Sequence, residues 1–260
     1  MLRRTSSIVA LGLALVAVFT SVARADGLPT GVLVPGRLAD ALGTGGLVAV
    51  AQPSDPTARV AYQIDSIADP RFAGAEFPAG SVIMYDLEPW PASSAPERAD
   101  PQWALQTFVS QAHADGYVAI IAPAWRMVGY TTEGCSRMVG ETRWAAYLRC
   151  LASVPADGLL VQAQYFQCGS WAGRVLSAAA VQPGRTWGEV SLQIAPDKSA
   201  GACINGAWID SLAASLGGSA SLSMWGLGGW PTASADCSTI DIRCEADQIA
   251  IGADAMAGLP

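Results

Sequence analysis

Apolar positions along the chain follow two alternating periods. After Asp100 and Pro101, apolar side chains recur every three or four residues until Gly116, which predicts a helix with Asp100 as its N-cap. Residues 117–121 are apolar and partly β-branched, a pattern typical of a buried strand. The same alternation predicts helices from 55 to about 67 and near 141–153, 171–181 and 206–216, and strands near 47–51, 82–87, 159–165, 189–195 and 220–225.

Strands that alternate with helices indicate a parallel sheet, either an open doubly wound sheet or a closed barrel. In each predicted strand one parity is apolar and the other turns polar toward the carboxyl end, as with Leu159 and Val161 against Gln162 and Gln164. An open doubly wound sheet is apolar on both parities, whereas a barrel mouth collects polar residues at the carboxyl ends of its strands. We therefore favour a TIM-like (β/α) barrel. Because six strands are clear where eight are expected, we expect it to be irregular or incomplete, with residues 31–34 or the C-terminal tail supplying the remainder.

The N-terminal segment has the pattern of a secretion signal. A basic start at Arg3 and Arg4 precedes an apolar stretch from 8 to 22, and Ala23-Arg24-Ala25 supplies the small-x-small pattern that signal peptidase cleaves. A membrane anchor would need about 20 apolar residues and no cleavage site. We expect residues 1–25 to be removed and residues 26–260 to form a single domain, secreted, extracellular and without a membrane anchor.

Charge and motifs exclude several classes of partner and cofactor. Loss of the three arginines in the signal would change the formal net charge from −7 to −10, because no acidic residue precedes Asp26. Such a charge repels nucleic acid and anionic membranes. The chain has no Walker loop, no Gly-x-Gly-x-x-Gly after a strand and no Cys-x-x-Cys, and His113 is its only histidine. We therefore expect no cofactor, no metal site and no histidine-based catalytic triad.

All six cysteines follow the predicted signal. An even number of cysteines in an oxidising compartment predicts disulfides, although six cysteines allow fifteen pairings. We predict bonds between neighbours in the sequence: Cys135 with Cys150, Cys168 with Cys203, and Cys237 with Cys244.

Asp86 and Glu88 are the strongest candidates for catalysis. They stand two apart at the end of the strand predicted near 82–87, so their side chains share one face and their backbones lie about 6.6 Å apart. Two carboxylates this close raise the pKa of one of them. A pair with one protonated and one ionised member is what glycoside hydrolysis uses. The alternative is that both acids are solvated or cap the following loop.

Aromatic and amide side chains gather at the same strand ends. Flat tryptophan rings could stack on sugar rings, and glutamine amides could hydrogen-bond sugar hydroxyls. As an alternative, the tryptophans plug the top of the barrel. The candidates for substrate binding are Trp90, Trp125, Trp225, Gln162, Gln164 and Gln193.

Four segments carry a resemblance to a known family: Tyr85-Asp86-Leu87-Glu88-Pro89-Trp90 with its proline-rich loop, Asp100-Pro101 with its helix, Ala122-Pro123-Ala124, and Gln162-Ala163-Gln164. Over about residues 45 to 230 the chain resembles the secreted glycoside-hydrolase-like (β/α) barrels of high-GC bacteria. In chitinase-type and muramidase-type barrels, the Glu of a strand-end Asp-x-Glu donates the proton and the Asp orients an N-acetyl group or the intermediate. The resemblance implies that Glu88 is the acid and Asp86 its partner. The full chitinase pattern would have aspartates where this chain has Ser81 and Met84.

These observations predict a secreted carbohydrate-active barrel. We expect it to hydrolyse glycosidic bonds of an extracellular or cell-wall polysaccharide, to take a polysaccharide or oligosaccharide as its partner, and to act as a monomer. Two alternatives stay open. One is a non-catalytic carbohydrate-binding barrel that keeps the tryptophans, and the other is a secreted protein-interaction or inhibitor domain on the same scaffold.

Overall fold

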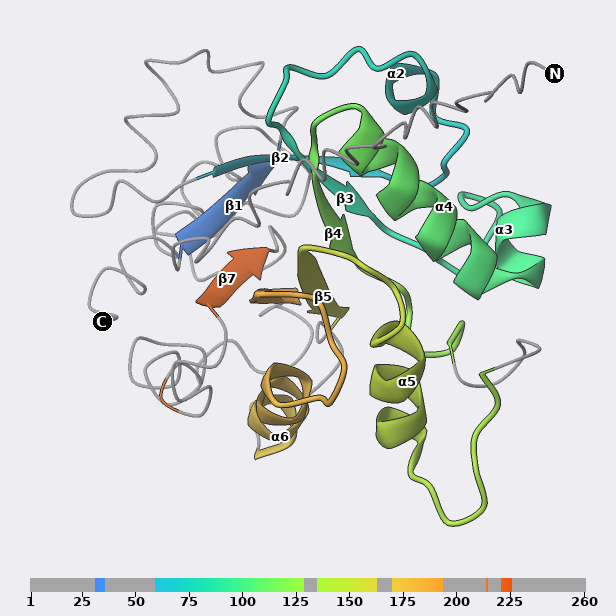
Figure 1. The fold of residues 1–260 in the computed structure, drawn as a ribbon, viewed down its shortest axis with the longest axis vertical. Helices are drawn as coiled ribbons and strands as arrows, with labels where there is room; N and C mark the ends of the chain where they lie inside the picture. Colours follow the sequence, from blue (N-terminus) through green and yellow to red (C-terminus); the bar gives the residue numbers. More distant parts are fainter. Residues whose placement is uncertain are drawn as a thin grey trace, which may run out of the picture.

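A parallel sheet organises the part of the chain that the computed structural model describes, which is residues 31–35, 59–128, 135–162, 170–193, 214 and 221–225. Adjacent strands are parallel, their order follows the sequence, and β1 pairs with both β2 and β7 (Figure 1). The fold is therefore α/β with an all-parallel sheet, as predicted. Its strands within the described residues are β1 (Gly31–Pro35), β2 (Arg59–Ile64), β3 (Val82–Tyr85), β4 (Val118–Ile121), β5 (Gly158–Gln162), β6 (Glu189–Gln193) and β7 (Ser221–Trp225).

Helices lie between these strands in the described part of the chain. They are α2 (Pro70–Ala73), α3 (Ala95–Ala99), α4 (Pro101–Ala114), α5 (Arg143–Leu151) and α6 (Ser170–Ala180). At the start of α4 the backbone N–H of Trp103 donates to Asp100 Oδ1 at 3.0 Å, so the predicted N-cap is confirmed. Thr142 caps α5 in the same way, with Ala145 N 3.2 Å from its Oγ1. α4 ends just before Gly116, whose φ of 76° is in the left-handed region that favours glycine.

The helix predicted from 55 to about 67 is wrong, because the structure forms β2 there. Val60, Ile64 and Ile67 fit the helical period, but the strand period of two fits as well. Ala61 lies in one buried cluster and Ile64 in another, on opposite faces of the sheet. β1 and β3 pair with β2 on its two sides, and this tertiary context overrides the local helical pattern.

Some predicted segments lie outside the described residues. These are the signal at 1–25, the strand near 47–51, and the helix near 206–216 apart from Ala214, which is helical. The strand expected at 31–34 is present as β1. No helix in the described part of the chain has the length and apolar character needed to cross a membrane.

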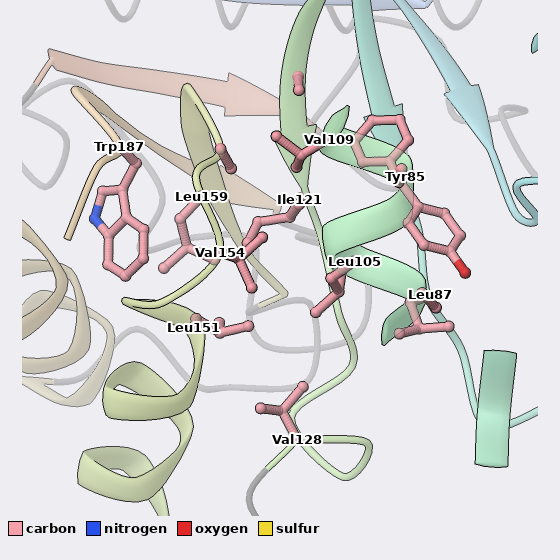
Figure 2. Close-up of a cluster of buried hydrophobic side chains, with 14 of the residues drawn as sticks. Tyr85, Leu87, Leu105, Val109, Ile121, Val128, Leu151, Val154, Leu159 and Trp187 are labelled. Carbon is pink, nitrogen blue, oxygen red and sulfur yellow. The ribbon is translucent and has the colours of Figure 1, made fainter. Parts of the chain in front are cut away.

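The two faces of the sheet have different neighbours. On one face Ile83, Tyr85 and Leu87 join a large buried cluster with Leu105 and Phe108 of α4, and side chains of α2, α5 and α6 belong to the same cluster (Figure 2). The opposite face holds a smaller buried cluster drawn from the strands and their ends: Ala61, Val82, Met84, Ile120, Ala122 and Leu160. Residues with the parity of Met84 therefore point away from α2, α4, α5 and α6.

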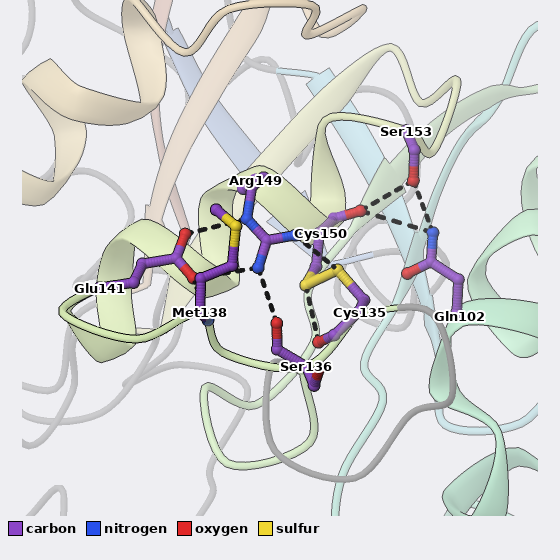
Figure 3. Close-up of a disulfide and its surroundings, with 8 residues drawn as sticks. All are labelled: Gln102, Cys135, Ser136, Met138, Glu141, Arg149, Cys150 and Ser153. Carbon is purple, nitrogen blue, oxygen red and sulfur yellow. Dashed lines mark hydrogen bonds and ion pairs between the residues drawn. A yellow bond between two sulfur atoms is a disulfide. The ribbon is translucent and has the colours of Figure 1, made fainter.

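The predicted bond between Cys135 and Cys150 is confirmed. Their Cα atoms are 5.5 Å apart, and the bond joins the segment before α5 to the helix itself. Arg149 braces the same turn, with hydrogen bonds of 2.9 and 3.0 Å to the carboxylate of Glu141 and of 2.8 Å to the carbonyl of Ser136 (Figure 3). The other two predicted pairs, Cys168 with Cys203 and Cys237 with Cys244, lie outside the described residues.

Candidate functional site

Asp86 stands directly after β3, on the face that points away from the helices. Its backbone N–H donates to Ile64 O at 2.9 Å and so extends the ladder between β2 and β3 by one residue. Its side chain is 8% exposed. Two amides hold the carboxyl group: Gln162 Nε2 lies 2.7 Å from Oδ1, and Gln63 Nε2 lies 3.1 Å from Oδ2. Three strands, β2, β3 and β5, therefore meet at this carboxyl group.

Glu88 is half-buried and close enough to Asp86 that each carboxyl group shifts the pKa of the other. The side chains of Gln162 and Trp90 also lower the pKa of Glu88. The two acids that the sequence placed on one face thus interact electrostatically. A side chain predicted to bind substrate, Gln162, donates to Asp86 and acts on the pKa of Glu88 as well.

The electrostatics of this pair separate its two members. Burial raises the pKa of Asp86 to about 8, the negative charges of Glu88 and Asp65 add to the rise, and the hydrogen bond from Gln162 opposes it. Burial also raises the pKa of Glu88, but hydrogen bonds from Gln162, Trp90 and Asp86 oppose that rise. The hydrogen bond between the acids raises the pKa of Asp86 and lowers that of Glu88, as expected when a protonated Asp86 donates to an ionised Glu88. Near neutral pH the Asp86 carboxyl group, with a pKa of about 8, therefore carries a proton.

Residues after Glu88 fold back against the end of β2. Ser93 is fully buried, and its Oγ accepts a hydrogen bond from the backbone N–H of Glu88 at 3.0 Å and donates one to Asp65 O at 2.8 Å. Arg98 of α3 donates to Ser93 O at 2.9 Å. Ser93 therefore fixes the backbone of Glu88 relative to the strand that carries Gln63.

A buried carboxylate anchors α3 to the same loop. Glu97 is 1% exposed, and it accepts hydrogen bonds from Ser66 Oγ at 2.8 Å, Ile67 N at 2.7 Å and Ser94 N at 2.6 Å. Three donors satisfy most of what a buried carboxylate requires. This arrangement fixes the start of α3 on one side of the loop that follows Glu88, while β2 fixes the other side of that loop.

The remaining predicted binding residues are placed to different degrees. Trp90 is 56% exposed, beside Glu88. Trp125 is half-buried just beyond β4 and packs against Trp144, with ring centroids 6.4 Å apart. Gln193 pairs in the backbone ladder with Gln162 on one side and with Trp225 on the other. Gln164 lies outside the described residues.

Sequence reasoning missed three contributors: Gln63, Asp65 and Ser93. Gln63 and Asp65 were hidden because their segment was assigned to a helix. The alternation of Ala61 and Gln63 with Tyr62 and Ile64 could have revealed a polar strand end like that of β3. Ser93 lies in an irregular loop, where no period shows which hydroxyl turns inward.

Two groups of the site could act on a substrate: the protonated carboxyl group of Asp86 and the exposed ring of Trp90. No group of three or more His, Cys, Asp or Glu side chains in the described ranges is arranged to hold a metal ion. A carboxyl pair that shares one proton can protonate a leaving oxygen, which is general acid catalysis. Trp90 offers a flat apolar surface beside it.

No protein-family model matches the chain, and no curated protein matches it. We therefore infer a function from the geometry of the site.

Proposed function

We propose that this protein is a secreted glycoside hydrolase of (β/α)-barrel architecture, with Glu88 as the general acid and Asp86 as its proton-sharing partner. The observation that carries the proposal is the buried Asp86 carboxyl group, which accepts hydrogen bonds from Gln63 and Gln162 and holds a proton near neutral pH, beside half-buried Glu88. Hydrolysis of a glycosidic bond needs such a protonated carboxyl group beside the leaving oxygen.

Strand pairing and side-chain placement support the barrel. β1 pairs with β7 as well as with β2, so the ladder returns to its first strand. The small cluster on the face away from the helices contains residues of the strands and their ends only. Asp86 and Gln162 stand at the carboxyl ends of β3 and β5, and catalytic residues of TIM barrels occupy these ends of the strands.

The position of the two acids at the end of β3 restricts where the substrate bond can lie. Carboxyl groups that flank a glycosidic bond are about 5 to 9.5 Å apart, depending on the stereochemical outcome. Asp86 and Glu88 instead stand two residues apart at the end of β3, and each shifts the pKa of the other, so we place the substrate bond beside Glu88 and not between the two acids. Glu88 alone meets the leaving oxygen: it passes the proton of Asp86 to that oxygen, so Asp86 ends ionised and Glu88 ends as it began. The nucleophile on the other side of the sugar is water or a group of the substrate itself.

Exposure decides which member of the pair meets the substrate. Asp86 is 8% exposed and both its oxygens accept amide hydrogen bonds, whereas Glu88 is half-buried. Trp90 is exposed and close enough to Glu88 to lower its pKa, and it offers a surface on which a sugar ring could stack as its glycosidic oxygen meets the acid. We place the substrate outside the cell, as an extracellular or cell-wall polysaccharide, because residues 1–25 have the sequence pattern of a secretion signal, and we expect a monomer.

The test measures the release of reducing ends by the wild type and Glu88→Gln on chitin, peptidoglycan, α-glucan and β-glucan. Glutamine keeps the size of the side chain but cannot donate the acid proton, so turnover should fall about 10²- to 10⁴-fold. Glu76→Gln is the matched control, because Glu76 is exposed and precedes β3. Equal hydrolysis by the wild type and Glu88→Gln would overturn the assignment.

Because Trp90 is exposed, a second function is also supported, that of a non-catalytic carbohydrate-binding barrel. In that case neither the wild type nor Glu88→Gln would release reducing ends. Both would still bind a polysaccharide in a pull-down assay, and Trp90→Ala would weaken the binding.

A further inference from the structure

Gln63 stands near the end of β2, on the face of the sheet that carries Asp86. Ala61, two residues earlier, belongs to the small buried cluster on that face, and Gln63 and Asp65 continue the same parity. Gln63 pairs in the backbone ladder with Met84, and Asp86 follows Met84 by two residues. The side chains of Gln63, Asp65 and Asp86 therefore leave the same face at the carboxyl ends of β2 and β3.

One amide nitrogen joins two carboxyl groups at this point. Gln63 Nε2 lies 3.0 Å from Asp65 Oδ1 and 3.1 Å from Asp86 Oδ2. A primary amide nitrogen carries two hydrogens, and its oxygen carries none. An amide oxygen in the same place would face the carboxylate of Asp65, which only accepts hydrogen bonds. The nitrogen is therefore the end of the Gln63 amide that faces both acids, and it donates one hydrogen to each.

The second amide on Asp86, that of Gln162, has a different additional partner. Its Nε2 lies 2.7 Å from Asp86 Oδ1 and 2.9 Å from Ala122 O, a backbone carbonyl just after β4. Gln162 thus ties one oxygen of Asp86 to the backbone, whereas Gln63 ties the other oxygen to a side chain. Gln63 and Asp65 are exposed and Asp86 is 8% exposed. Gln63 therefore links the buried carboxyl group to the surface.

The backbone of Asp65 is fixed as well. Its carbonyl accepts a hydrogen bond from the hydroxyl of Ser93 at 2.8 Å, and the same hydroxyl accepts the backbone N–H of Glu88 at 3.0 Å. Asp65 is thus held at its carbonyl by Ser93 and at its carboxylate by Gln63. This gives the Gln63 amide a fixed second acceptor, which orients the amide toward Asp86.

The hydrogen bonds on Asp86 change in strength when its proton leaves. Asp86 then becomes a carboxylate, and hydrogen bonds to an ionised acceptor are about twice as strong as those to a neutral one. Burial and the charges of Glu88 and Asp65 oppose this ionisation, because they raise the pKa of Asp86. On the side of α5, burial and the charges of the two acids raise the pKa of Tyr147. A donor that is already oriented favours release of the proton without rearrangement at the moment of reaction.

We propose that Gln63 is a positioning residue for the proposed hydrolysis, which holds the Asp86 carboxyl group at its Oδ2 atom and favours the release of its proton to Glu88. This inference rests on the proposed function. In each turnover the O–H bond of Asp86 breaks as one forms at Glu88, and Glu88 passes a proton to the leaving oxygen. The water consumed in the hydrolysis releases one proton, which restores that of Asp86. Asp65 acts one step further away, because it orients the amide of Gln63.

The experiment measures the titration of Asp86 by carboxyl ¹³C NMR in the full secreted chain, for the wild type, Gln63→Met and Gln63→Glu. Methionine has the length of glutamine but no N–H group. We expect the Asp86 midpoint to rise by about one pH unit in Gln63→Met, because the ionised form loses a hydrogen bond. The rise should be larger in Gln63→Glu, which also adds a negative charge. A general loosening of the structure would have the opposite effect, because water would reach Asp86 and lower its midpoint toward about 4.

Gln102→Met is the matched control. Gln102 Nε2 also contacts two acceptors, Ser153 Oγ at 2.7 Å and Cys150 O at 3.4 Å, but it joins α4 to α5 and the loop after it. The Asp86 midpoint in this variant should equal that of the wild type. If methionine at position 63 prevents folding, Gln63→Glu carries the same test. An Asp86 midpoint that stays unchanged or falls in the Gln63 variants would overturn the proposal.

Turnover separates this proposal from the hydrolase assignment. On a glycan that the wild type hydrolyses, Gln63→Met should lower kcat by about three- to tenfold with a smaller change in KM, because Gln63 acts on the acid and not on the substrate. If hydrolysis depends on Glu88 but the Asp86 midpoint and kcat are unchanged in Gln63→Met, the hydrolase assignment stands and the role of Gln63 is wrong. If the midpoint rises but the wild type hydrolyses no glycan, Gln63 acts on Asp86 and the hydrolase assignment is wrong.

Discussion

Gln162 Nε2 lies 2.7 Å from Asp86 Oδ1, although β4 separates the strands that carry the two residues. In a flat sheet, strands two apart are about 9.5 Å apart. The same amide nitrogen is 2.9 Å from Ala122 O, at the end of the intervening strand. Ala122 is buried, and its side chain is a single methyl group. The side chain of Gln162 therefore passes over Ala122 and reaches Asp86. The carboxyl ends of β3, β4 and β5 are thereby joined into one site.

Asp86 should make the free energy of unfolding depend on pH. Its pKa is raised from 3.8 to about 8 in the folded chain, so the folded state binds the proton more tightly than the unfolded state. Its contribution to stability is fully present below about pH 4 and is lost as the pH rises through 8, by up to about 1.4 kcal/mol per pH unit. Because asparagine does not titrate, the Asp86→Asn variant should not lose this stability as the pH rises. Urea denaturation at intervals from pH 4 to 9 should show wild type and variant diverging as the pH rises, and parallel curves would contradict the raised pKa.

Ser93 should act as a positioning residue for Glu88. Ser93→Ala removes the acceptor of the Glu88 backbone N–H and the donor to Asp65 O, two hydrogen bonds of 3.0 and 2.8 Å. We expect amide hydrogen exchange at Glu88 to accelerate about tenfold, since its N–H loses a partner worth about 1 kcal/mol or more. Turnover should fall, with a smaller change in KM. Ser93→Thr keeps the hydroxyl and should restore part of the protection.

Ser153→Ala is the control for that substitution. Its hydroxyl also makes two hydrogen bonds, to Cys150 O at 2.9 Å and from Gln102 Nε2 at 2.7 Å, but on the loop after α5. Glu88 exchange should be unchanged in this variant. Equal acceleration in both variants would show a general loss of stability and no specific role for Ser93.

The disulfide between Cys135 and Cys150 should contribute measurably to stability. It closes a loop with a sequence separation of 15, for which the restriction of the unfolded chain amounts to about 3 kcal/mol. The double substitution Cys135→Ser with Cys150→Ser should lower the free energy of unfolding by about 2 to 4 kcal/mol. Urea denaturation of the oxidised wild type and the variant measures the difference, and coincident curves would contradict it. Peptide mapping of the unreduced protein tests the pairs predicted for the other four cysteines.

The features of the fold that were predicted correctly are those marked in the sequence by a repeating hydrophobic pattern or by a contact between neighbouring residues. The alternation in β3, with Ile83 and Tyr85 on one parity and Met84 and Asp86 on the other, is reproduced as two faces with different neighbours. The N-cap at Asp100 is reproduced because a cap is a contact between residues close in sequence. β2 was missed because its apolar residues satisfy both periods, and only its pairing with β1 and β3 decides between them.

The candidate site was predictable in composition but not in its internal roles. Parity placed Asp86 and Gln162 on one face, and the structure brings them into contact. The resemblance implied that Glu88 carries the acid proton, whereas burial raises the pKa of Asp86 to about 8 and so keeps a proton on Asp86 near neutral pH. That distribution depends on desolvation and on donors from other strands, neither of which has a sequence period.

The proton held by the Asp86 and Glu88 pair is best measured by carboxyl ¹³C NMR titration of the protein labelled at aspartate and glutamate. We expect Asp86 to titrate near 8, and its midpoint to fall in Glu88→Gln, because a neighbouring negative charge is removed. Asp86→Asn identifies the resonance by its loss. A midpoint for Asp86 near 4, as for a solvated carboxyl group, with no response to Glu88→Gln, would contradict the proton-sharing pair on which the proposed hydrolysis depends.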